Sequence, residues 1–377
     1  WLEDVDGGSD FGRISLQEMS TRLCGSADLF ATEPGRGAPA SINFVSCHDG
    51  FTLTDLTRYR SKHNEANGEN NNDGSSVNHS ANFGVEGVND DPDVIAAREQ
   101  AAMNMIGMLL LSLGTPMMLA GDEFRNTQDG NNNAYCQDND ITWLKWDWMY
   151  STNKTREMRR LETVSRLVAL RKSLDLYHHE DFFTRLTQIG LLKPSSRVQW
   201  FLPDGTTPME RDWFDLGVRS FTMRLLSNSE VDVCIVVNGT ADDRTFRLPP
   251  DTHWTPKWCS AEINGRRAGH GTQVEECDLN GDTTVWTQHV PDASETVLKM
   301  VEEVAMQRTE SSTENEADTI EFTMPVTDHA ANGTSSVPRD EVSADMPDAP
   351  VDDTPDTPVD DNVWTMPALS ITLMKQV

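Results

Sequence analysis

One segment of the 377-residue chain limits what the rest can fold into. Residues 301–361 contain 17 acidic residues against two basic ones, together with six prolines and a single aromatic residue, Phe322. A segment of low hydrophobicity and high like charge cannot bury enough apolar surface to offset the entropy lost on ordering. We therefore predict that residues 300–361 are a disordered acidic insertion, either a solvating spacer or an arm that binds a partner.

The charge and cysteine content of the whole chain argue against several classes of protein. The 61 acidic and 31 basic residues give a net charge of −30, which repels nucleic-acid phosphate. The longest apolar run, Met103–Leu113, is shorter than the roughly 18–20 residues that span a membrane. Six cysteines stand without a C-x-x-C pair, which favours a reducing compartment over a disulfide framework. We expect neither a nucleic-acid partner nor a membrane.

The N-terminal sequence limits what can be inferred about localisation. The chain begins at Trp1, without Met, in Asp- and Gly-rich sequence typical of the interior of a protein. We therefore expect a fragment truncated at its N-terminus, in which a missing targeting signal proves nothing. We infer a cytoplasmic location, with which the cysteine usage agrees.

Residues 1–178 alternate strand-like and helix-like blocks. Apolar strands are predicted over residues 41–47 and 117–120, and each leads into polar residues. Alternating strands and helices with polar residues at the strand ends are typical of α/β folds and compatible with a barrel.

Two helices complete this part. Asp91-Pro92 is a cap and first-turn signal before apolar residues at helical spacing, and a second helix is predicted over residues 154–173. We interpret the methionines here as core packing. The five arginines of the second helix (Arg156, Arg159, Arg160, Arg166 and Arg171) are interpreted as a solvated face.

Residues 179–299, completed by residues 362–377, are predicted to form an antiparallel β-sandwich. Runs of β-branched and apolar residues recur here, and Asn238-Gly239 is a tight-turn signal. The predicted strands lie at 198–201, 220–226, 231–237, 245–248 and 363–374. The acidic insertion would then interrupt the sandwich before its last strand.

The sharpest chemical feature is the pair His48-Asp49, which directly follows the strand at 41–47. At the carboxyl end of a barrel strand, such a pair can exchange hydrogen bonds with the vicinal hydroxyls of a sugar. Alone, the dipeptide is a weak signal, because many His-Asp pairs are merely satisfied polar groups.

Longer motifs give the pair its context. They are His63-Asn-Glu-Ala-Asn-Gly-Glu-Asn-Asn-Asn-Asp-Gly74, Leu113-Gly-Thr-Pro-Met-Met-Leu-Ala-Gly-Asp-Glu-Phe124 and Gly130-Asn-Asn-Asn-Ala-Tyr-Cys-Gln-Asp-Asn-Asp140. With these motifs, residues 14–177 closely resemble the C-terminal half of bacterial glycogen debranching enzymes of the isoamylase type, in the α-amylase superfamily of glycoside hydrolases. The resemblance continues more loosely through Trp200 into the predicted sandwich.

The resemblance implies the C-terminal part of a (β/α)8 TIM barrel, followed by the sandwich. Residues 42–47 and 116–120 would be the seventh and eighth barrel strands. Such enzymes hydrolyse α-1,6 branch linkages of glycogen or limit dextrin with retention of configuration. Asp49 matches the carboxylate that stabilises the transition state, and His48 matches the neighbouring histidine that binds substrate.

The chain departs from the pattern of these enzymes at the reacting carboxylates. The nucleophile usually lies in Gly-x-Arg-x-Asp, which does not occur here, and the general acid is a Glu on an earlier strand. Glu123 is a tempting substitute for the acid, but it maps to the eighth strand. We therefore expect this chain alone to be inactive.

Four other residues are expected to bind substrate: Asn131, Asn132, Tyr135 and Trp143. Amides and aromatic rings suit sugar hydroxyls and sugar faces, although Asn-rich runs are also ordinary turn formers and the two rings could equally be packing. The histidines show no metal-ligand spacing, and Asp278–Asp282 resembles a calcium loop but lacks its Gly and Glu. We expect no metal and no cofactor.

Three readings of function remain open. The first is an enzyme acting on glycogen or a branched α-glucan. The second is a non-catalytic glucan-binding or regulatory remnant. The third is a pullulanase-like or trehalose-forming relative, against which the two Asn-rich motifs argue.

Overall fold

The computed structural model describes residues 14–31, 35–178, 182, 184–186, 192–194, 197–227, 232–250, 253–270, 275–276, 362–367 and 370–376. By its contacts the chain divides into two units, residues 1–294 with 359–377, and residues 295–358. Every described residue lies in the first unit. The predicted acidic insertion and the calcium-like text Asp278–Asp282 lie outside the described residues.

Two short parallel strands lie at the centre of the N-terminal part. β1 (Ile42–Asn43) pairs with β2 (Thr115–Pro116), with Ile42 opposite Thr115. The strands expected over residues 41–47 and 116–120 are therefore much shorter in the structure. Within the described part of the chain β1 and β2 form a two-stranded sheet, so no strand pairs with the other edge of β1. The side chain of Ile42 is 60% exposed. A closed barrel is not formed by the described residues.

The other elements of the described N-terminal part are helices. α1 (Leu16–Leu23) begins with a capping box in which Ser15 and Glu18 satisfy each other's backbone amides. The other short elements are α2 (Ala27–Phe30), η2 (Ala38–Ala40), α3 (Leu53–Leu56), η3 (Glu65–Asn67), η4 (Asp122–Phe124), η5 (Asp147–Tyr150) and η6 (Asp175–His178).

The longest helix, α4 (Pro92–Leu111), starts where Asp91-Pro92 predicts. The Asp91 side chain accepts a hydrogen bond from the Asp93 amide, and Pro92 occupies the first turn. By length and composition α4 is the one described helix that could cross a membrane, although 61% of its apolar window is buried inside the protein. The run Met103–Leu113 covers only the C-terminal part of this helix, which already begins at Pro92. α4 is a core helix.

The second predicted helix is α5 (Arg156–Ser173), capped by Thr155. Three of its five arginines do not lie on a solvated face, which corrects the prediction for them, whereas Arg156 is exposed as predicted. Arg160 is 1% exposed and pairs with Glu99, and Arg166 pairs with Glu262. Arg171 donates to three backbone carbonyl oxygens at the end of α4 and just beyond it. These arginines fasten α5 to its neighbours.

The C-terminal part is antiparallel. A five-stranded sheet has the order β5 (Val198–Phe201), β6 (Ser220–Leu225), β7 (Val233–Asn238), β14 (Ser370–Gln376), β9 (Trp254–Cys259). A three-stranded sheet has the order β11 (Gly269–His270), β13 (Val363–Met366), β8 (Arg244–Arg247). The remaining elements are β3 (Thr184–Leu186), β4 (Leu192–Pro194), α6 (Glu210–Phe214), η7 (Ser260–Asn264), β10 (Arg266–Arg267) and β12 (Glu275–Glu276). The predicted strand after the acidic text is present as β13 and β14.

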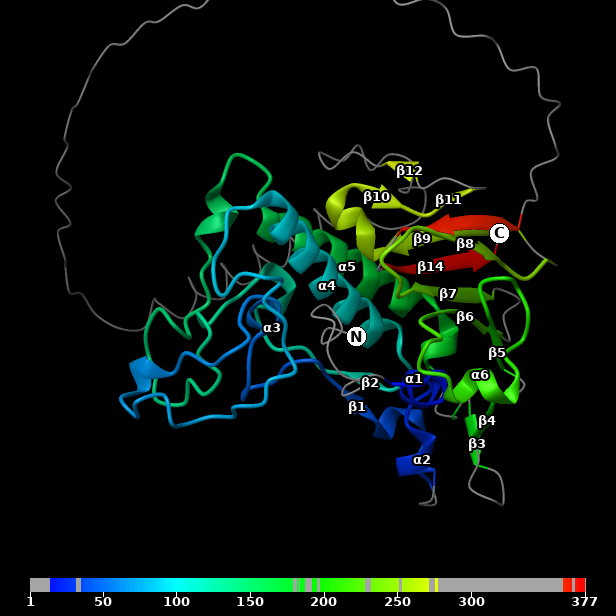
Figure 1. Ribbon diagram of the computed structural model, residues 1–377, viewed down its shortest axis with the longest axis horizontal. Coiled ribbons are helices and arrows are strands. Elements are labelled where there is room, and N and C mark those ends of the chain that lie inside the picture. Colours follow the sequence, from blue (N-terminus) through cyan, green and yellow to red (C-terminus); the bar gives the residue numbers. More distant parts are fainter. Residues whose placement is uncertain are drawn as a thin grey trace, which may run out of the picture. The chain divides into compact units, whose positions relative to one another are not determined.

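The five-stranded sheet is buried on both faces. On one face Cys234 and Val236 of β7 pack with Phe246 and Trp364 of the three-stranded sheet. On the other face, Ile235 and its neighbours join a core that includes residues of α1, α4 and α5. Figure 1 shows α4 and α5 running together beside this sheet. Burial on both faces explains why β7 has a continuous apolar sequence instead of an alternating one.

Gly107 of α4 lies close against the five-stranded sheet. A methyl group added at Gly107 would lie 2.8 Å from Cη2 of Trp258, a fully buried ring of β9. We expect Gly107→Ala to lower the free energy of unfolding by about 1–3 kcal/mol through overpacking, although alanine favours helices by about 1 kcal/mol over glycine. Urea unfolding measures the change.

Trp258→Leu provides the control for this prediction. The smaller side chain removes the ring that the added methyl group would meet. Adding Gly107→Ala to Trp258→Leu should therefore be neutral or stabilising. An equal cost in both backgrounds would contradict the contact as the cause.

Candidate functional site

The predicted site lies on the His-Asp loop, residues 46–53, which follows β1 and ends at the start of α3. His48 Nε2 lies 3.2 Å from Asp49 Oδ2, and the two side chains are 86% and 73% exposed. Both side chains are therefore open to solvent and can form hydrogen bonds with a ligand. It has the chemistry needed to bind a polyhydroxylated ligand.

The Asp122 side chain bonds to both ends of the His-Asp loop. Ser46 Oγ donates to Asp122 Oδ2, and the Leu53 amide donates to Asp122 Oδ1 at 2.9 Å. Parallel pairing of β1 with β2 explains the encounter, because the carboxyl ends of parallel strands meet at one edge of a sheet. Asp122 is 2% exposed, and burial raises the pKa of its carboxyl to about 6, against the lowering effect of these hydrogen bonds and of Arg160.

Residues 122–132, which include Asp122, also bond to the middle of the His-Asp loop. The Gly50 amide donates to the Asn132 carbonyl oxygen at 2.9 Å, and Thr52 Oγ1 donates to the Asn126 carbonyl oxygen at 3.1 Å. Phe51, two residues after Asp49, is buried. The backbone around His48-Asp49 is therefore tied at several points to residues 122–132, while the pair itself stays exposed.

Asn131 and Asn132, which we expected to bind substrate, are 1% and 3% exposed. Asn132 Oδ1 accepts from Asn64 Nδ2 at 2.9 Å, and its Nδ2 donates to Ser75 and Asn78. Asn131 Nδ2 donates to Asn67 Oδ1 at 2.9 Å. Direct substrate binding by these amides stays a prediction, and in the structure they are used to hold the protein together.

The two Asn-rich motifs are thus one interlocked unit. Gly74 shows how closely they approach, because a Cβ there would lie 2.4 Å from Asn132 Oδ1, and its backbone φ of +72° also favours glycine. Asp73 Oδ2 accepts from Asn67 within its own motif and from Asn133 of the other motif. Each motif alone resembles ordinary turn sequence, so sequence inspection missed their mutual pairing.

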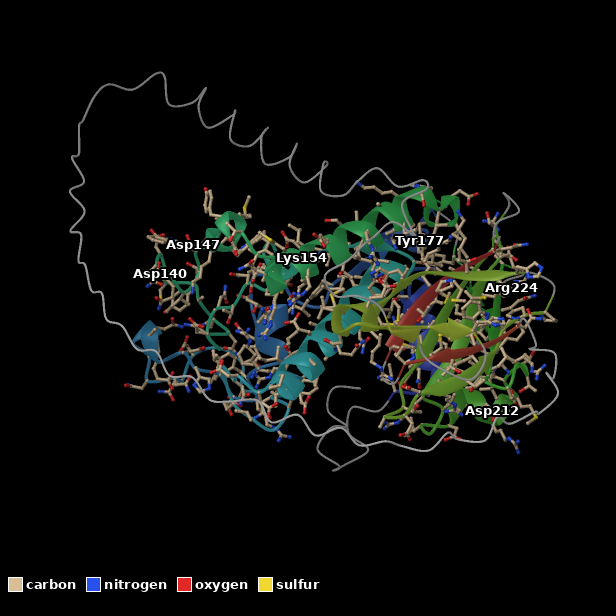
Figure 2. The ribbon with its side chains drawn as sticks, turned by 90° about the horizontal axis from the view of Figure 1, so that it is seen from above. Asp140, Asp147, Lys154, Tyr177, Asp212 and Arg224 are labelled. Carbon is tan, nitrogen blue, oxygen red and sulfur yellow. The ribbon has the colours of Figure 1, made fainter. Side chains whose placement is uncertain are left out.

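Tyr135 and Trp143 are 68% and 56% exposed, as expected of rings that could stack on sugars. Trp143 Nε1 donates to Asp138 Oδ1 at 2.9 Å. The loops that carry Asp140 and Asp147 lie toward the Lys154 end of α5, away from Tyr177 (Figure 2). Substrate binding by these rings stays a prediction.

A buried charge cluster, which the sequence did not reveal, supports the Asp122 segment. Arg160 Nη2 lies 2.8 Å from Glu99 Oε2, and Arg125 bridges Glu99 and Glu157 at 2.6 and 2.9 Å. Arg160 also donates to the Asp122 carbonyl oxygen at 3.4 Å. The cluster joins α4 and α5 to the turn that bears Asp122.

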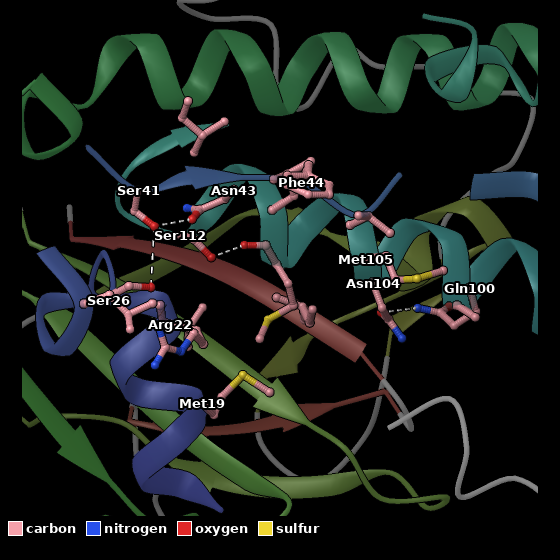
Figure 3. A pocket seen from close by; sticks show the side chains of 18 of the residues that line it. Met19, Arg22, Ser26, Ser41, Asn43, Phe44, Gln100, Asn104, Met105 and Ser112 are labelled. Carbon is pink, nitrogen blue, oxygen red and sulfur yellow. Dashed lines mark hydrogen bonds between the residues drawn. The ribbon is translucent and has the colours of Figure 1, made fainter. Parts of the chain in front are cut away.

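A cavity of the described chain lies elsewhere. It has a volume of about 640 Å³ between α1, β1 and α4, and none of the predicted site residues lines it. Figure 3 shows Met19 and Met105 among its apolar lining and Ser41 near Asn43 among its few polar groups. Within the described residues no group of three His, Cys, Asp or Glu side chains could hold a metal ion.

The raised pKa of Asp122 predicts a pH dependence of stability. The pKa of Asp122 is about 6 in the folded chain and 3.8 in its ordinary state, so between these values the folded chain keeps a proton that the unfolded chain loses. The contribution of this group to stability is therefore complete below about pH 4 and is lost as the pH rises through 6, by about 3 kcal/mol in total. Because Asn does not titrate, the free energy of unfolding of Asp122→Asn should rise by this amount relative to the parent between pH 4 and 7, measured by urea unfolding.

Asp147→Asn is the control, because it makes the same change at an exposed position. Its free energy of unfolding should keep a constant difference from the parent over this pH range. A constant difference for Asp122→Asn as well would contradict the buried titration.

Sequence comparison identifies the class of protein that this chain resembles. No protein-family model matches the chain. It is 37% identical over 270 residues to the glycogen debranching enzyme of Pectobacterium atrosepticum, covering 71% of this chain and 38% of that enzyme. It is 53% identical over 134 residues to the glycogen debranching enzyme of Escherichia fergusonii, covering 36% and 20%. The predicted resemblance to bacterial glycogen debranching enzymes is confirmed.

The chain also matches the glycogen operon protein GlgX homolog of Mycobacterium tuberculosis. The two are 44% identical over 210 residues, which cover 55% of this chain and 28% of that protein. The chain spans less than two fifths of the length of these relatives. Among solved structures, a pullulanase of GBS with maltotetraose gives a TM-score of 0.46 at 10% identity, covering 100% of this chain and 38% of that one. An Anoxybacillus pullulanase with maltotetraose gives 0.40 at 17%, covering 69% and 29%. These TM-scores are too low to define a fold.

Proposed function

We propose that this chain is part of an enzyme that hydrolyses α-1,6 branch linkages of glycogen or limit dextrin with retention of configuration. The observation that carries the proposal is the exposed His48–Asp49 pair at the carboxyl end of β1, beside β2. Relatives that are named glycogen debranching enzymes support it.

In this proposal, β1 and β2 are remnants of the seventh and eighth strands of a (β/α)8 barrel within residues 1–178. Residues 179–299 with 362–377 form the sandwich domain, and residues 300–361 form an insertion. The parallel register of β1 with β2 supports the barrel, because neighbouring barrel strands are parallel. The fold needs further parallel strands on the open side of β1.

Asp49 would act on the transition state. Retaining glycosidases use two carboxyl groups about 5–5.5 Å apart, one as nucleophile and one as acid and base, around an oxocarbenium-like centre. Asp49 would accept hydrogen bonds from hydroxyls of the sugar at that centre, and these bonds strengthen as the ring distorts. His48 would donate to a neighbouring hydroxyl. We propose that the 377 residues alone are inactive, because they contain no Gly-x-Arg-x-Asp motif for the nucleophile.

The test is an assay of the full-length gene product on glycogen phosphorylase limit dextrin. We expect release of short linear maltooligosaccharides whose first-formed anomer, followed by proton NMR, is α. A β-anomer would overturn retention, and release of nothing would overturn the hydrolase. The 377-residue chain alone, assayed beside it, should release nothing.

A glucan-binding protein without hydrolase activity is the second candidate. The exposed rings of Tyr135 and Trp143 favour it, because exposed aromatic faces stack on sugars. Affinity electrophoresis in glycogen gels separates the two. Retarded migration of a full-length product that releases no sugar would support the binding protein and contradict the enzyme.

A further inference from the structure

The ends of the His-Asp loop are joined through a single side chain. Ser46 stands before His48-Asp49, Leu53 stands after the pair, and both donate to the carboxylate of Asp122. Each uses a different oxygen of that group. A carboxylate can accept both bonds at once, whereas a hydroxyl side chain could not reach both ends in the same way.

The surroundings of Asp122 fix its own position. Its carbonyl oxygen accepts from Arg160, and its flanking turn is closed by a hydrogen bond from the Asn126 amide to the Gly121 carbonyl oxygen at 2.9 Å. Arg160 in turn is anchored by Glu99 in α4. Through Arg160, the residue that carries this carboxylate is therefore bonded to the buried charge cluster that links α4 and α5.

We propose that Asp122 is a positioning residue that holds the exposed His48–Asp49 pair in its working geometry by clamping the two ends of the His-Asp loop. The proposal rests on the function proposed for Asp49. Between the ends, Gly50 and Thr52 also bond to Asn132 and Asn126. The side chains of His48 and Asp49 contact each other, and Cys47 Sγ donates to the Asp49 carbonyl oxygen. Catalytic groups must be held within about 0.5 Å of their productive position. The clamp supplies part of that constraint.

Two substitutions of Asp122 distinguish the effect of its hydrogen bonds from the effect of its side-chain volume. Asp122→Ala removes both acceptors. Asp122→Asn keeps the oxygen for the Leu53 amide, and its NH2 group can donate to Ser46 Oγ, so the clamp is largely preserved. Ser46→Ala breaks one bond and serves as the second variant if Asp122→Ala does not fold.

The first readout is hydrogen exchange of the amides of residues 47–53, measured by mass spectrometry on the full-length protein. We expect exchange to rise about tenfold in Asp122→Ala and to rise measurably in Ser46→Ala, because lost hydrogen bonds favour local opening. Asp122→Asn should stay within about threefold of the parent. Unchanged exchange in both Asp122→Ala and Ser46→Ala overturns the clamp.

Asp232→Ala is the matched control. It also removes a largely buried carboxylate, which pairs with Arg224 of β6 at 2.7 Å, and no described contact joins it to the His-Asp loop. It should leave exchange of residues 47–53 unchanged. Equal acceleration in this control would mean that any loss of stability loosens the loop, and the proposal would fall.

The second readout is kinetic, on branched glucan. Asp122→Ala should lower kcat about a hundredfold with KM within about threefold, and Asp122→Asn should recover most of kcat. A purely structural role would lower the active fraction in both variants alike. If the parent protein shows no debranching activity, the proposed function fails, whereas the exchange experiment still decides whether Asp122 clamps the loop.

Discussion

Replacing Asp49 by Asn in the full-length gene product is expected to lower kcat on branched α-glucan about a thousandfold. Hydrogen bonds to the sugar hydroxyls strengthen in the transition state, and a loss of about 4 kcal/mol of such binding corresponds to this factor. The Asp49 side chain is 73% exposed, so the free energy of unfolding should change by less than about 0.5 kcal/mol. Initial rates on limit dextrin and urea unfolding measure the two quantities.

Asp90→Asn is the control for this prediction, because it makes the same chemical change at another exposed position. It should leave both kcat and stability at parental values. Near-normal turnover in Asp49→Asn would refute the assignment of Asp49. A large loss of stability would instead show that the carboxylate is needed by the fold.

The elements that the sequence predicted well are those with a local signal. α4 begins at Pro92 because a capping Asp91 and a first-turn proline define a helix start without help from the rest of the fold. β6 and β7 are predicted because runs of apolar and β-branched residues between turn signals are typical of buried strands. The strands at 42–47 and 116–120 were overestimated, since an apolar run does not show where pairing stops.

The contacts that build the candidate site have no local signal. Ser46 and Asp122 lie far apart in the sequence and meet only because β1 and β2 pair in parallel. Arg160 looked like a surface residue because helical spacing does not reveal that Glu99 of α4 faces it. The amides of Asn64 and Asn132 likewise satisfy each other across two separate motifs. The sequence therefore predicts His48–Asp49 as a candidate site but not the buried groups that hold its loop.

Replacing Arg160 by Met is expected to lower the free energy of unfolding by about 3–5 kcal/mol. Arg160 is 1% exposed, and both its Nε and its Nη2 donate to Glu99 Oε2, at 3.2 and 2.8 Å. Burial favours the neutral form of Glu99, yet the charges of Arg160 and Arg125 hold its pKa below the ordinary value. Without Arg160 a buried carboxylate is left with only Arg125 to balance it. Urea unfolding at pH 7 measures the loss.

Two controls identify the unpaired charge as the cause. Arg156→Met changes an exposed arginine of the same helix and should alter stability by less than about 0.5 kcal/mol. The double variant Arg160→Met with Glu99→Gln removes the charge that Arg160→Met leaves behind, so it should be more stable than Arg160→Met alone. If the double variant is less stable than Arg160→Met, the cost comes from lost packing and hydrogen bonds and not from the stranded carboxylate. The cluster would then support Asp122 through shape, and charge-conserving changes such as Arg160→Lys would disturb the His-Asp loop as much as Arg160→Met does.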